Sequence, residues 1–277
     1  MPPTSSPPAA ATMHNPYHWY EFGPNMRAPG LLRIALEWRA PWEYGAALLA
    51  QPFLAQAPHG DGHPVLIFPG LMASDTSTKP LRKFLESRGY AVVGWGLGSN
   101  LGPRDGVLDH CRKLLKDLRR QHKRKVSLIG WSLGGIYARE LAKEFPRDVR
   151  LVITMGTPFT GHPKATNAWR LYEIVTGHRI GEPEIHEPLR APPPVPTTSI
   201  YSRSDGIVAW QCSVEKAGPL HENIEVEASH FGLGLNPLAW WAVADRLAQA
   251  GGRWQPFERG SGWREWLYRD PKRKGWF

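Results

Sequence analysis

The sequence predicts an α/β fold with a mainly parallel central sheet and helices on both of its faces. Short apolar runs alternate along the chain with longer amphipathic stretches, as expected where crossover helices join parallel strands. The chain has 277 residues, of which 42% are hydrophobic, so one domain with a large core is expected. We expect strands near residues 64–69, 91–96, 125–131, 151–155, 197–202 and 223–228, and helices near 75–88, 105–121, 134–145 and 237–250.

The third expected strand runs directly into a Gly-x-Ser-x-Gly motif, Gly130-Trp-Ser-Leu-Gly134, and a helix follows at once. This strand–turn–helix setting is typical of a nucleophile elbow, which raises a serine hydroxyl above the sheet. Glycine suits the outer positions of the motif, because a tight turn leaves no room for a Cβ atom there. We therefore predict that Ser132 is a catalytic nucleophile. The alternative is a chance match, since glycine and serine are common in loops.

A serine hydroxyl is a weak nucleophile at neutral pH, so Ser132 requires a base. His230 is the best candidate, because it follows a strand-like run in a loop that leads into a helix. His221, on the loop before that strand, is the second candidate. The alternative for any single histidine is a structural, hydrogen-bonding role.

The base in turn requires an acid that orients it, and the order Ser, acid, His along the chain is typical of nucleophile-elbow enzymes. Asp205 lies in a turn just beyond the expected strand at 197–202, where sheet-based active sites gather their residues. Its alternative role is that of a turn aspartate that caps its own backbone. The less suitable acids, which lie before the next strand or in a proline-rich stretch, are Asp148, Glu184 and Glu187.

An acyl-transfer site also needs two backbone N–H donors for the oxyanion. One donor is expected from Leu133, directly after the nucleophile, and the other from the loop after an earlier strand. That loop begins at Pro69-Gly70, so its donor would be Leu71 or, as the second choice, Met72. The alternative is an ordinary connection between a strand and a helix.

Together these segments resemble an α/β-hydrolase of the bacterial esterase and lipase type. The segments that carry the resemblance are Phe68-Pro-Gly-Leu71, Gly130-Trp-Ser-Leu-Gly134, Gly156-Thr-Pro-Phe-Thr-Gly161, Ser204-Asp-Gly-Ile-Val208 and Ser229-His230. The resemblance covers about residues 60–250. In the lipase segment that usually reads Gly-Thr-Pro-His, Phe159 replaces the histidine, so this position carries no general base. The resemblance is specific for the fold and the triad, and much less so for the substrate.

The resemblance and the residue order imply an α/β-hydrolase fold and a serine hydrolase of carboxylic esters, that is, an esterase or lipase. Ser132 would attack the acyl carbonyl, His230 would carry the proton, and Asp205 would orient the imidazole, through an acyl-enzyme. One alternative is an acyltransferase that uses the same triad. Another is a non-catalytic hydrolase-fold module that binds a lipid or a protein, and a third is a nucleic-acid binder that uses the basic tail.

Four parts are expected along the chain: a disordered N-terminus at 1–12, a helical arm at 13–59, the hydrolase domain at 60–252 and an aromatic, basic tail at 253–277. Residues 160–196 interrupt the alternation of strands and helices. In the families that the chain resembles, insertions at this place form a cap over the active site. Apolar residues of the amphipathic piece at 167–176 need a surface to cover, which favours a small cap over a plain surface connection.

The arm carries Leu31, Ala35, Trp38 and Trp42 along one side, and Pro41 would divide it into two helical pieces. We expect this arm to pack on the domain. The alternative is that it anchors the protein to a membrane surface.

The tail mixes tryptophans with seven basic and three acidic residues, a net +4 of the chain's +9. This composition suits docking on the domain through the aromatic rings, which we rank first. Contact with an anionic lipid surface ranks second, and single-stranded nucleic acid third. No nucleic-acid-binding motif accompanies the tail, so a nucleic acid is not expected as a partner.

The two cysteines, Cys111 and Cys212, have no neighbours at metal-ligand spacing, and no phosphate-binding glycine motif occurs. We therefore expect no metal and no cofactor, and the partner would be a small-molecule or lipid ester substrate. The sequence shows no secretory signal pattern and no long apolar run, so the expected location is cytoplasmic, with membrane association as the alternative.

Overall fold

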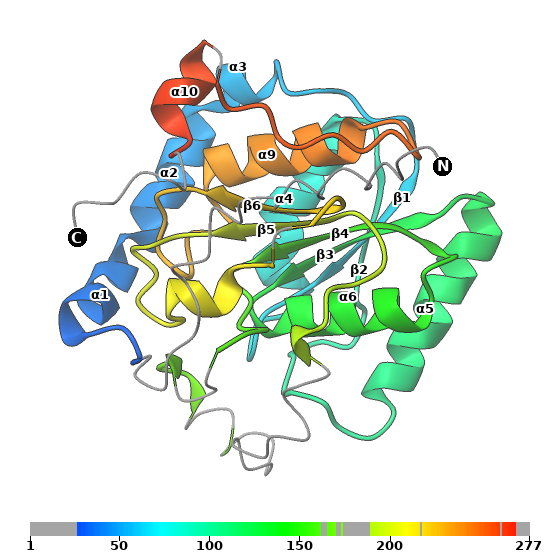
Figure 1. The fold of residues 1–277 in the computed structure, drawn as a ribbon, viewed down its shortest axis with the longest axis horizontal. Helices are drawn as coiled ribbons and strands as arrows, with labels where there is room; N and C mark the ends of the chain where they lie inside the picture. The colour runs from blue at the N-terminus through cyan, green and yellow to red at the C-terminus, as the bar shows by residue number, and fades with distance from the viewer. Residues whose placement is uncertain are drawn as a thin grey trace, which may run out of the picture.

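A computed structural model describes residues 27–161, 165–169, 173, 189–216, 218–260 and 262–269 of the chain. Within these residues, six parallel strands form one sheet in the order β2-β1-β3-β4-β5-β6 (Figure 1). The strands are β1 (Pro64–Phe68), β2 (Ala91–Gly94), β3 (Val126–Trp131), β4 (Val149–Met155), β5 (Thr197–Tyr201) and β6 (His221–Glu225). The predicted α/β fold with a parallel central sheet is confirmed. The expected disordered N-terminus and most of the expected cap lie outside the described residues.

Helices cover both faces of the sheet (Figure 1). The four that pack on it are α4 (Asp75–Ser87), α5 (Val107–His122), α6 (Leu133–Glu144) and α9 (Pro237–Ala248). Side chains that alternate along β1 supply both layers: Leu66 packs in the core with α5 and α6, and Ile67 packs in the core with α4 and α9. The predicted arrangement of helices on both faces is therefore present.

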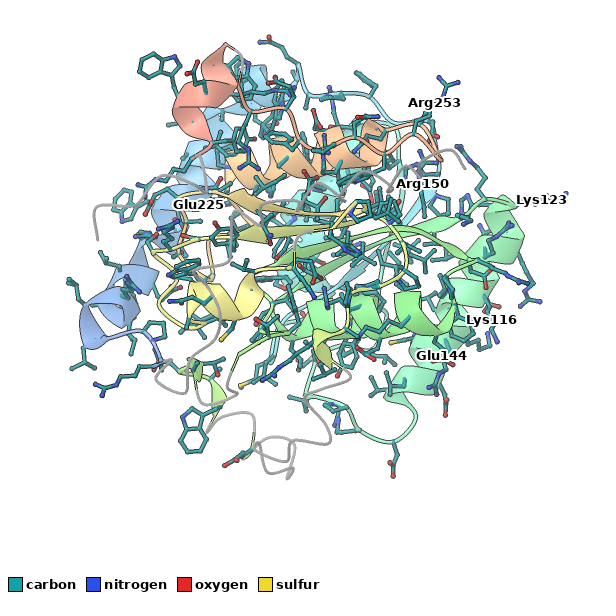
Figure 2. The ribbon with its side chains drawn as sticks, viewed as in Figure 1. Lys116, Lys123, Glu144, Arg150, Glu225 and Arg253 are labelled. Atoms are coloured by element: carbon teal, nitrogen blue, oxygen red, sulfur yellow. The ribbon has the colours of Figure 1, made fainter. Side chains whose placement is uncertain are left out.

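The outer surface of the α5–α6 layer is charged. Lys116, Lys123 and Glu144 are exposed there and point away from the sheet (Figure 2). An apolar inner side and a charged outer side are what a helix needs between a core and water. The exposed basic residues of α5, among them Lys113, Lys116 and Arg120, therefore lie on its solvated side.

Strand β6 is where the predicted and the observed boundaries differ most. The sequence predicts a strand near 223–228, whereas the chain pairs with β5 over His221–Glu225 and then leaves the sheet. β5 ends at Tyr201, and beyond it the Ala228 N–H donates to the Ser202 hydroxyl. The end of the neighbouring strand therefore ends β6. The other predicted strands and helices begin and end within two residues of the observed ones.

The chain reaches the sheet through an arm. It consists of α1 (Leu31–Ala35), the 3-10 helix η2 (Leu36–Arg39), α2 (Ala40–Leu49) and α3 (Gln51–Leu54). Pro41 lies in the first turn of α2, where its missing N–H is not needed, and the predicted break falls at η2. In the part of the chain that the structure describes, no helix is both long enough and apolar enough to cross a membrane.

The side of the arm that contacts the domain is not the apolar side predicted from the sequence, which carries Trp38 and Trp42. Glu37, Ala47 and Leu54 are buried against the domain. Trp38 and Trp42, by contrast, are 85% and 79% exposed. The tryptophans therefore do not hold the arm in place. The buried side of the arm does, and it includes the carboxylate of Glu37.

Part of the tail also packs on the domain. Trp263 of α10 (Trp263–Leu267) lies edge-on to Trp241 of α9, with ring centroids 4.9 Å apart. Tyr268 is buried next to it, and its hydroxyl donates to a carbonyl of α9 at 2.8 Å. Trp266 remains 87% exposed. Among the described residues of the tail, some aromatic side chains thus serve packing, whereas Trp266 is left at the surface.

A buried ion pair joins α6 to the segment before β6. Arg139 donates to Glu215, and both side chains are fully buried. The guanidinium also lies 3.7 Å from the ring centroid of Phe159 and donates to Ala191 O at 3.2 Å. Removing one partner would leave an uncompensated charge in the interior. The resulting loss of stability is much larger than the net stabilisation that the intact pair provides.

We expect Glu215→Gln to lower the free energy of unfolding by about 3–5 kcal/mol, because the Arg139 charge would stay buried without its counter-charge. Asp109→Asn, which removes an exposed acid paired with Arg112, should leave it nearly unchanged. Urea denaturation of both variants beside the wild type measures the difference. An effect of Glu215→Gln no larger than that of Asp109→Asn would contradict this role of the buried pair.

Candidate active site

Ser132 lies at the turn between β3 and α6, where the sequence predicts a nucleophile elbow. Its φ and ψ are 51° and −123°, a region that side-chain-bearing residues rarely occupy. Its N–H donates to Met155 O at 2.8 Å, which ties the turn to β4. The motif needs glycine for space, because a Cβ atom at Gly134 would lie 2.3 Å from Phe68 O. The chain thus holds a strained backbone at Ser132 through close contacts on two sides.

The structure brings Ser132, Asp205 and His230 together beyond the carboxyl ends of the strands. His230 Nε2 lies 3.0 Å from the Ser132 hydroxyl oxygen, and His230 Nδ1 lies 2.7 Å from Asp205 Oδ2. In the tautomer that carries its proton on Nδ1, the imidazole donates to Asp205 and leaves Nε2 to accept from Ser132. The three side chains can therefore form a continuous hydrogen-bonded chain of the kind that activates a serine.

Both oxygens of the Asp205 carboxylate have partners. Oδ1 accepts the N–H groups of Ile207 and Val208, at 2.8 and 2.7 Å, and Oδ2 faces His230. The side chain is 2% exposed. Asp205 therefore caps its own turn, the alternative role considered from the sequence, and also faces His230. The hydrogen bonds of Oδ1 to the turn fix the direction in which Oδ2 points.

Two carboxylates, Asp205 and Glu37, raise the pKa of the buried His230 against the effect of burial. Burial by itself lowers the pKa of the imidazole. The charge and the hydrogen bond of Asp205, together with the charge of Glu37, outweigh burial and raise the pKa above its usual 6.5. The two carboxylates therefore stabilise the imidazolium form of His230.

The loop after β4 passes next to the Asp205–His230 pair. Gly156 has a φ of 57°, and a Cβ atom there would lie 3.2 Å from His230 Nδ1 and 2.8 Å from Leu233 Cδ1. The glycine of the Gly-Thr-Pro segment is therefore required by space and by backbone conformation. Phe159, which replaces the histidine usual in lipases, is buried against a guanidinium and serves packing.

The loop after β1 runs directly past Ser132. A Cβ atom at Gly70 would lie 3.2 Å from the Ser132 Cβ, so glycine permits this approach. Met72 N–H donates to the carbonyl of a neighbouring loop at 2.7 Å, which makes it unsuitable as an oxyanion donor. Leu71 remains the better candidate on this loop. Leu133, the other predicted donor, is the first residue of α6.

Asn100 organises the loop after β1, and no sequence pattern singles it out. It is fully buried. Its side-chain amide donates to Pro69 O at 2.8 Å, its backbone N–H donates to Ala73 O at 2.8 Å, and its backbone O accepts from Met72 N. Asn100 thus fixes the loop that carries the candidate oxyanion donor.

Two acidic residues of the arm also reach the site, and sequence reasoning does not identify them. Glu43 accepts the Ser229 N–H at 2.7 Å and the Ser229 hydroxyl at 2.5 Å, on the loop that carries His230. Glu37 accepts three backbone N–H groups from the loops of Asp205 and His230. The sequence feature that could have pointed to Glu37 and Glu43 is that both are acidic residues within a segment rich in Leu, Ala and Trp.

The other residues that the sequence offers do not reach the site. His221 begins β6, and its Nε2 lies 3.0 Å from a backbone carbonyl. It is therefore at the amino end of the strand, and Ser132 is at the opposite edge of the sheet. Asp148 pairs with Arg119 at 3.6 Å. Glu184 and Glu187 lie outside the described residues.

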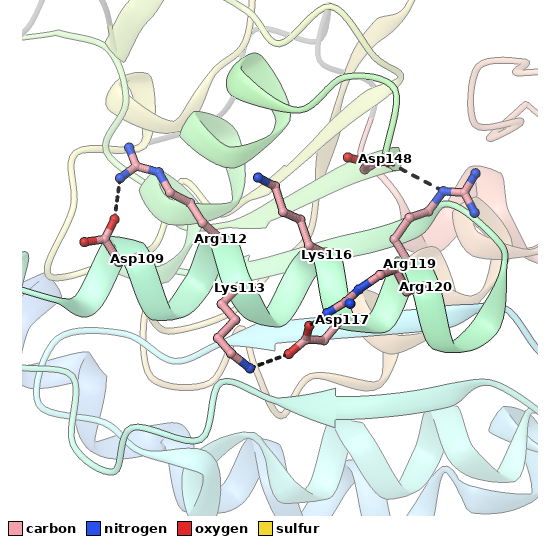
Figure 3. Close-up of a pocket in the computed structure, with 8 residues that line it drawn as sticks. All are labelled: Asp109, Arg112, Lys113, Lys116, Asp117, Arg119, Arg120 and Asp148. Carbon is pink, nitrogen blue, oxygen red and sulfur yellow. Dashed lines mark hydrogen bonds and ion pairs between the residues drawn. The ribbon is translucent and has the colours of Figure 1, made fainter.

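A hollow of about 550 Å³ lies away from this site, on the outer side of α5 (Figure 3). Its lining residues are charged: Asp109, Arg112, Lys113, Lys116, Asp117, Arg119, Arg120 and Asp148. Lys113 pairs with Asp117 at 2.7 Å, and the three arginines of the hollow also have carboxylate partners. This paired surface offers no nucleophile and is not a candidate active site.

No group of three or more side chains that could hold a metal ion occurs among the described residues. Cys111 and Cys212 are both buried. Burial raises the pKa of the Cys111 thiol to about 11, and burial together with the Asp205 charge raises that of Cys212 to about 12. Neither thiol is therefore a nucleophile at neutral pH.

Residues 59–268, more than half of the chain, match the model of the alpha/beta hydrolase family. Solved structures of other proteins share the fold. The lipase B of Aspergillus fumigatus has a TM-score of 0.55 and 19% identity, over 71% of this chain and 55% of that one. A structure of the metagenome-derived lipolytic enzymes LipS and LipT has a TM-score of 0.50 and 15% identity, over 64% of this chain and 89% of that one. At such identities the likeness concerns the fold alone.

Curated relatives match a shorter part of the chain. The human serine hydrolase BPHL is 34% identical over 110 residues, which is 36% of this chain and 38% of the relative. The pimeloyl-[acyl-carrier protein] methyl ester esterase of Legionella pneumophila is 33% identical over 98 residues, 35% of this chain and 39% of the relative. The match thus spans well under half the length of either relative.

We expect the pKa of His230 to lie above 6.5 and Asp205→Asn to lower it, because the amide removes the negative charge next to Nδ1. NMR titration of the imidazole Cε1–H signals measures both values. His63 is an internal control: burial, which outweighs its hydrogen bond to Asp61, lowers its pKa to about 4, and the variant should not move it. A His230 signal that titrates at the same pH in both proteins would contradict this arrangement.

Proposed function

Because the chain belongs to the alpha/beta hydrolase family, we propose that it is a serine hydrolase of carboxylic esters. The observation that carries the proposal is the hydrogen-bonded chain from Ser132 through His230 to Asp205, at 3.0 and 2.7 Å. Two relatives, one named a serine hydrolase and the other a methyl ester esterase, support the same class of reaction.

In the first half of the proposed reaction, the Ser132 hydroxyl oxygen attacks the carbonyl carbon of the ester. His230 Nε2 takes the hydroxyl proton, and Asp205 holds the imidazole and stabilises the imidazolium. The N–H groups of Leu133 and Leu71 donate to the oxyanion, next to the N-terminus of α6, which favours negative charge. When the tetrahedral intermediate collapses, the bond to the alcohol breaks. The alcohol leaves with the proton from Nε2, and the acyl group stays on Ser132.

In the second half, water takes the place of the alcohol. His230 Nε2 accepts a proton from the water as its oxygen attacks the acyl carbon. The bond between the acyl carbon and the Ser132 oxygen then breaks, and the proton on Nε2 returns to that oxygen. The sum is one ester and one water consumed, one acid and one alcohol formed, and the free hydroxyl of Ser132 restored.

The same groups would support acyl transfer if an alcohol or an amine replaced water in the second half. Product analysis with a competing alcohol separates the two activities. A hydrolase gives mostly the free acid, whereas an acyltransferase gives the new ester although water is in large excess. A non-catalytic module of the same fold would leave a fluorophosphonate probe unreacted, since such probes label an activated serine.

We expect the wild type to hydrolyse p-nitrophenyl esters, with an optimum of acyl chain length that separates esterase from lipase. Ser132→Ala should fold normally and lose at least about 10³-fold in kcat, because the nucleophile is gone. Steady-state kinetics over a series of short to long acyl chains measures both.

Ser87→Ala, a matched change at the end of α4, should keep the wild-type kcat. A fluorophosphonate probe should label the wild type and Ser87→Ala, and not Ser132→Ala. Equal activity or equal labelling of Ser132→Ala would show that another residue is the nucleophile.

We also propose that the protein makes peripheral contact with a membrane surface. Trp38 and Trp42 of the arm are 85% and 79% exposed, and Trp266 of the tail is 87% exposed. Exposed tryptophans favour the headgroup region of a bilayer, and the net charge of +9 favours anionic lipids. Such contact would bring the site near hydrophobic ester substrates.

Sedimentation with phosphatidylglycerol vesicles should recover the wild type, and the double variant Trp38→Gln, Trp42→Gln should be recovered less, because it loses the apolar part of the contact. Leu220→Gln makes the same kind of change at a site that is 37% exposed and outside the arm, and it should sediment like the wild type. Equal recovery of all three proteins would contradict a role of the arm in membrane contact.

A further inference from the structure

Glu37 of η2 connects the two loops that carry Asp205 and His230. Its Oε1 accepts the Gly206 N–H at 2.7 Å and the His230 N–H at 2.8 Å, and its Oε2 accepts the Phe231 N–H at 3.1 Å. The residue is 6% exposed. A single buried carboxylate is thus shared between the residue after the candidate acid and the candidate base itself.

These contacts restrain the relative position of two loops that follow different strands. Hydrogen bonds from N–H groups to a carboxylate are shorter and stronger than those to a neutral acceptor. Gly206 is adapted to the contact: a Cβ atom there would lie 2.9 Å from Glu37 Oε1 and 2.2 Å from Arg33 O. Glycine at this position therefore serves the approach of the arm as well as the turn after Asp205.

Neighbouring residues of the arm hold the same two loops from further away. Glu43 accepts from Ser229, and Arg39 donates to the Ser204 hydroxyl at 2.6 Å and to Glu43 at 3.2 Å. Glu37 differs from these residues in contacting His230 itself. The arm thus has several attachments, and the one made by Glu37 lies closest to the proposed chemistry.

Four groups of the described chain form hydrogen bonds with His230. Asp205 contacts Nδ1, Ser132 contacts Nε2, Glu37 accepts the backbone N–H, and the Trp131 indole donates to His230 O at 3.1 Å. Two of the four are carboxylates. The charge of Glu37 acts with that of Asp205, against burial, to raise the pKa of the imidazole.

We propose that Glu37 is a positioning residue for the acid and the base of this site. It holds the loops of Asp205 and His230 at a fixed separation, and its charge stabilises the imidazolium that forms when His230 takes the serine proton. The inference rests on the proposed function in one respect, that Ser132 is the nucleophile. Glu37 contacts no substrate and acts through the two loops.

Glu37→Gln tests this role, because it keeps the size of the side chain and removes its charge. The amide nitrogen that replaces one oxygen cannot accept an N–H group, so at least one of the three contacts is lost as well. We expect the His230 pKa, measured by NMR titration, to be lower than in the wild type. The acid limb of the kcat/KM profile should move to lower pH by the same amount, since His230 would stay neutral to lower pH. We expect kcat to fall about 10- to 100-fold, because the base is misplaced.

Two further variants separate positioning from simple loosening. Glu86→Gln makes the same chemical change on the exposed side of α4 and should match the wild type in every measurement. Glu43→Gln weakens the same arm without contacting His230. The loss of thermal midpoint in Glu43→Gln measures how far the arm is loosened. Its kcat and its pH profile then show what loosening alone does to catalysis.

A His230 pKa and a pH profile that are unchanged in Glu37→Gln would overturn the inference, and so would a fall in kcat that Glu43→Gln reproduces at an equal loss of thermal midpoint. The titration needs no turnover. If the wild type hydrolyses no ester and the His230 pKa still falls in Glu37→Gln, the proposed function fails while the contact between Glu37 and the base is supported.

Discussion

The backbone of Ser132 is the constraint on which the rest of the site depends. A non-glycine residue with a positive φ of this kind carries about 1–3 kcal/mol of backbone strain. It keeps this conformation only where contacts with the surrounding structure enforce it. Here β4 accepts the Ser132 N–H, and Gly134 sits against a carbonyl of β1 with no room for a side chain. Because the turn is held in this way, the loops after β1, β5 and β6 can all approach one hydroxyl group. The parallel sheet is what brings the ends of these strands to the same edge.

Buried carboxylates have two different uses in this molecule. Glu215 meets the guanidinium of Arg139, so its charge is neutralised and the pair joins two elements. Asp205 and Glu37 are satisfied mainly by backbone N–H groups. Such donors offset the loss of hydration but carry no full positive charge, so the negative charge remains available to an imidazolium. The difference between a structural acid and an acid of the site thus lies in the partners and not in the degree of burial.

Local patterns in the sequence predict the sheet and the approach of Ser132, Asp205 and His230, because each of these residues follows an apolar run and the ends of parallel strands meet. The same patterns misplace the end of β6, which depends on where β5 stops. They also miss Asn100 and Glu37, whose roles arise from contacts across the fold. Glu37 lies 193 residues before His230, and its partners are backbone N–H groups that leave no mark in the sequence. The apolar pattern of the arm even draws attention to Trp38 and Trp42, which are on the exposed side.

The arm therefore belongs to the site, although the sequence suggests a boundary between arm and domain near residue 60 and the family match begins at residue 59. The matched segment contains Ser132, Asp205 and His230, which we propose as nucleophile, acid and base, and the sheet that brings them together. It does not contain Glu37 or Glu43, which hold the loops of the acid and the base from outside. Loop-closure entropy grows slowly with chain length, so a long separation in sequence adds little cost to such a contact. The geometry at His230 is thus completed by a segment outside the matched residues. Under our proposal, substitutions in the arm can change the properties of His230 while Ser132 and Asp205 stay the same.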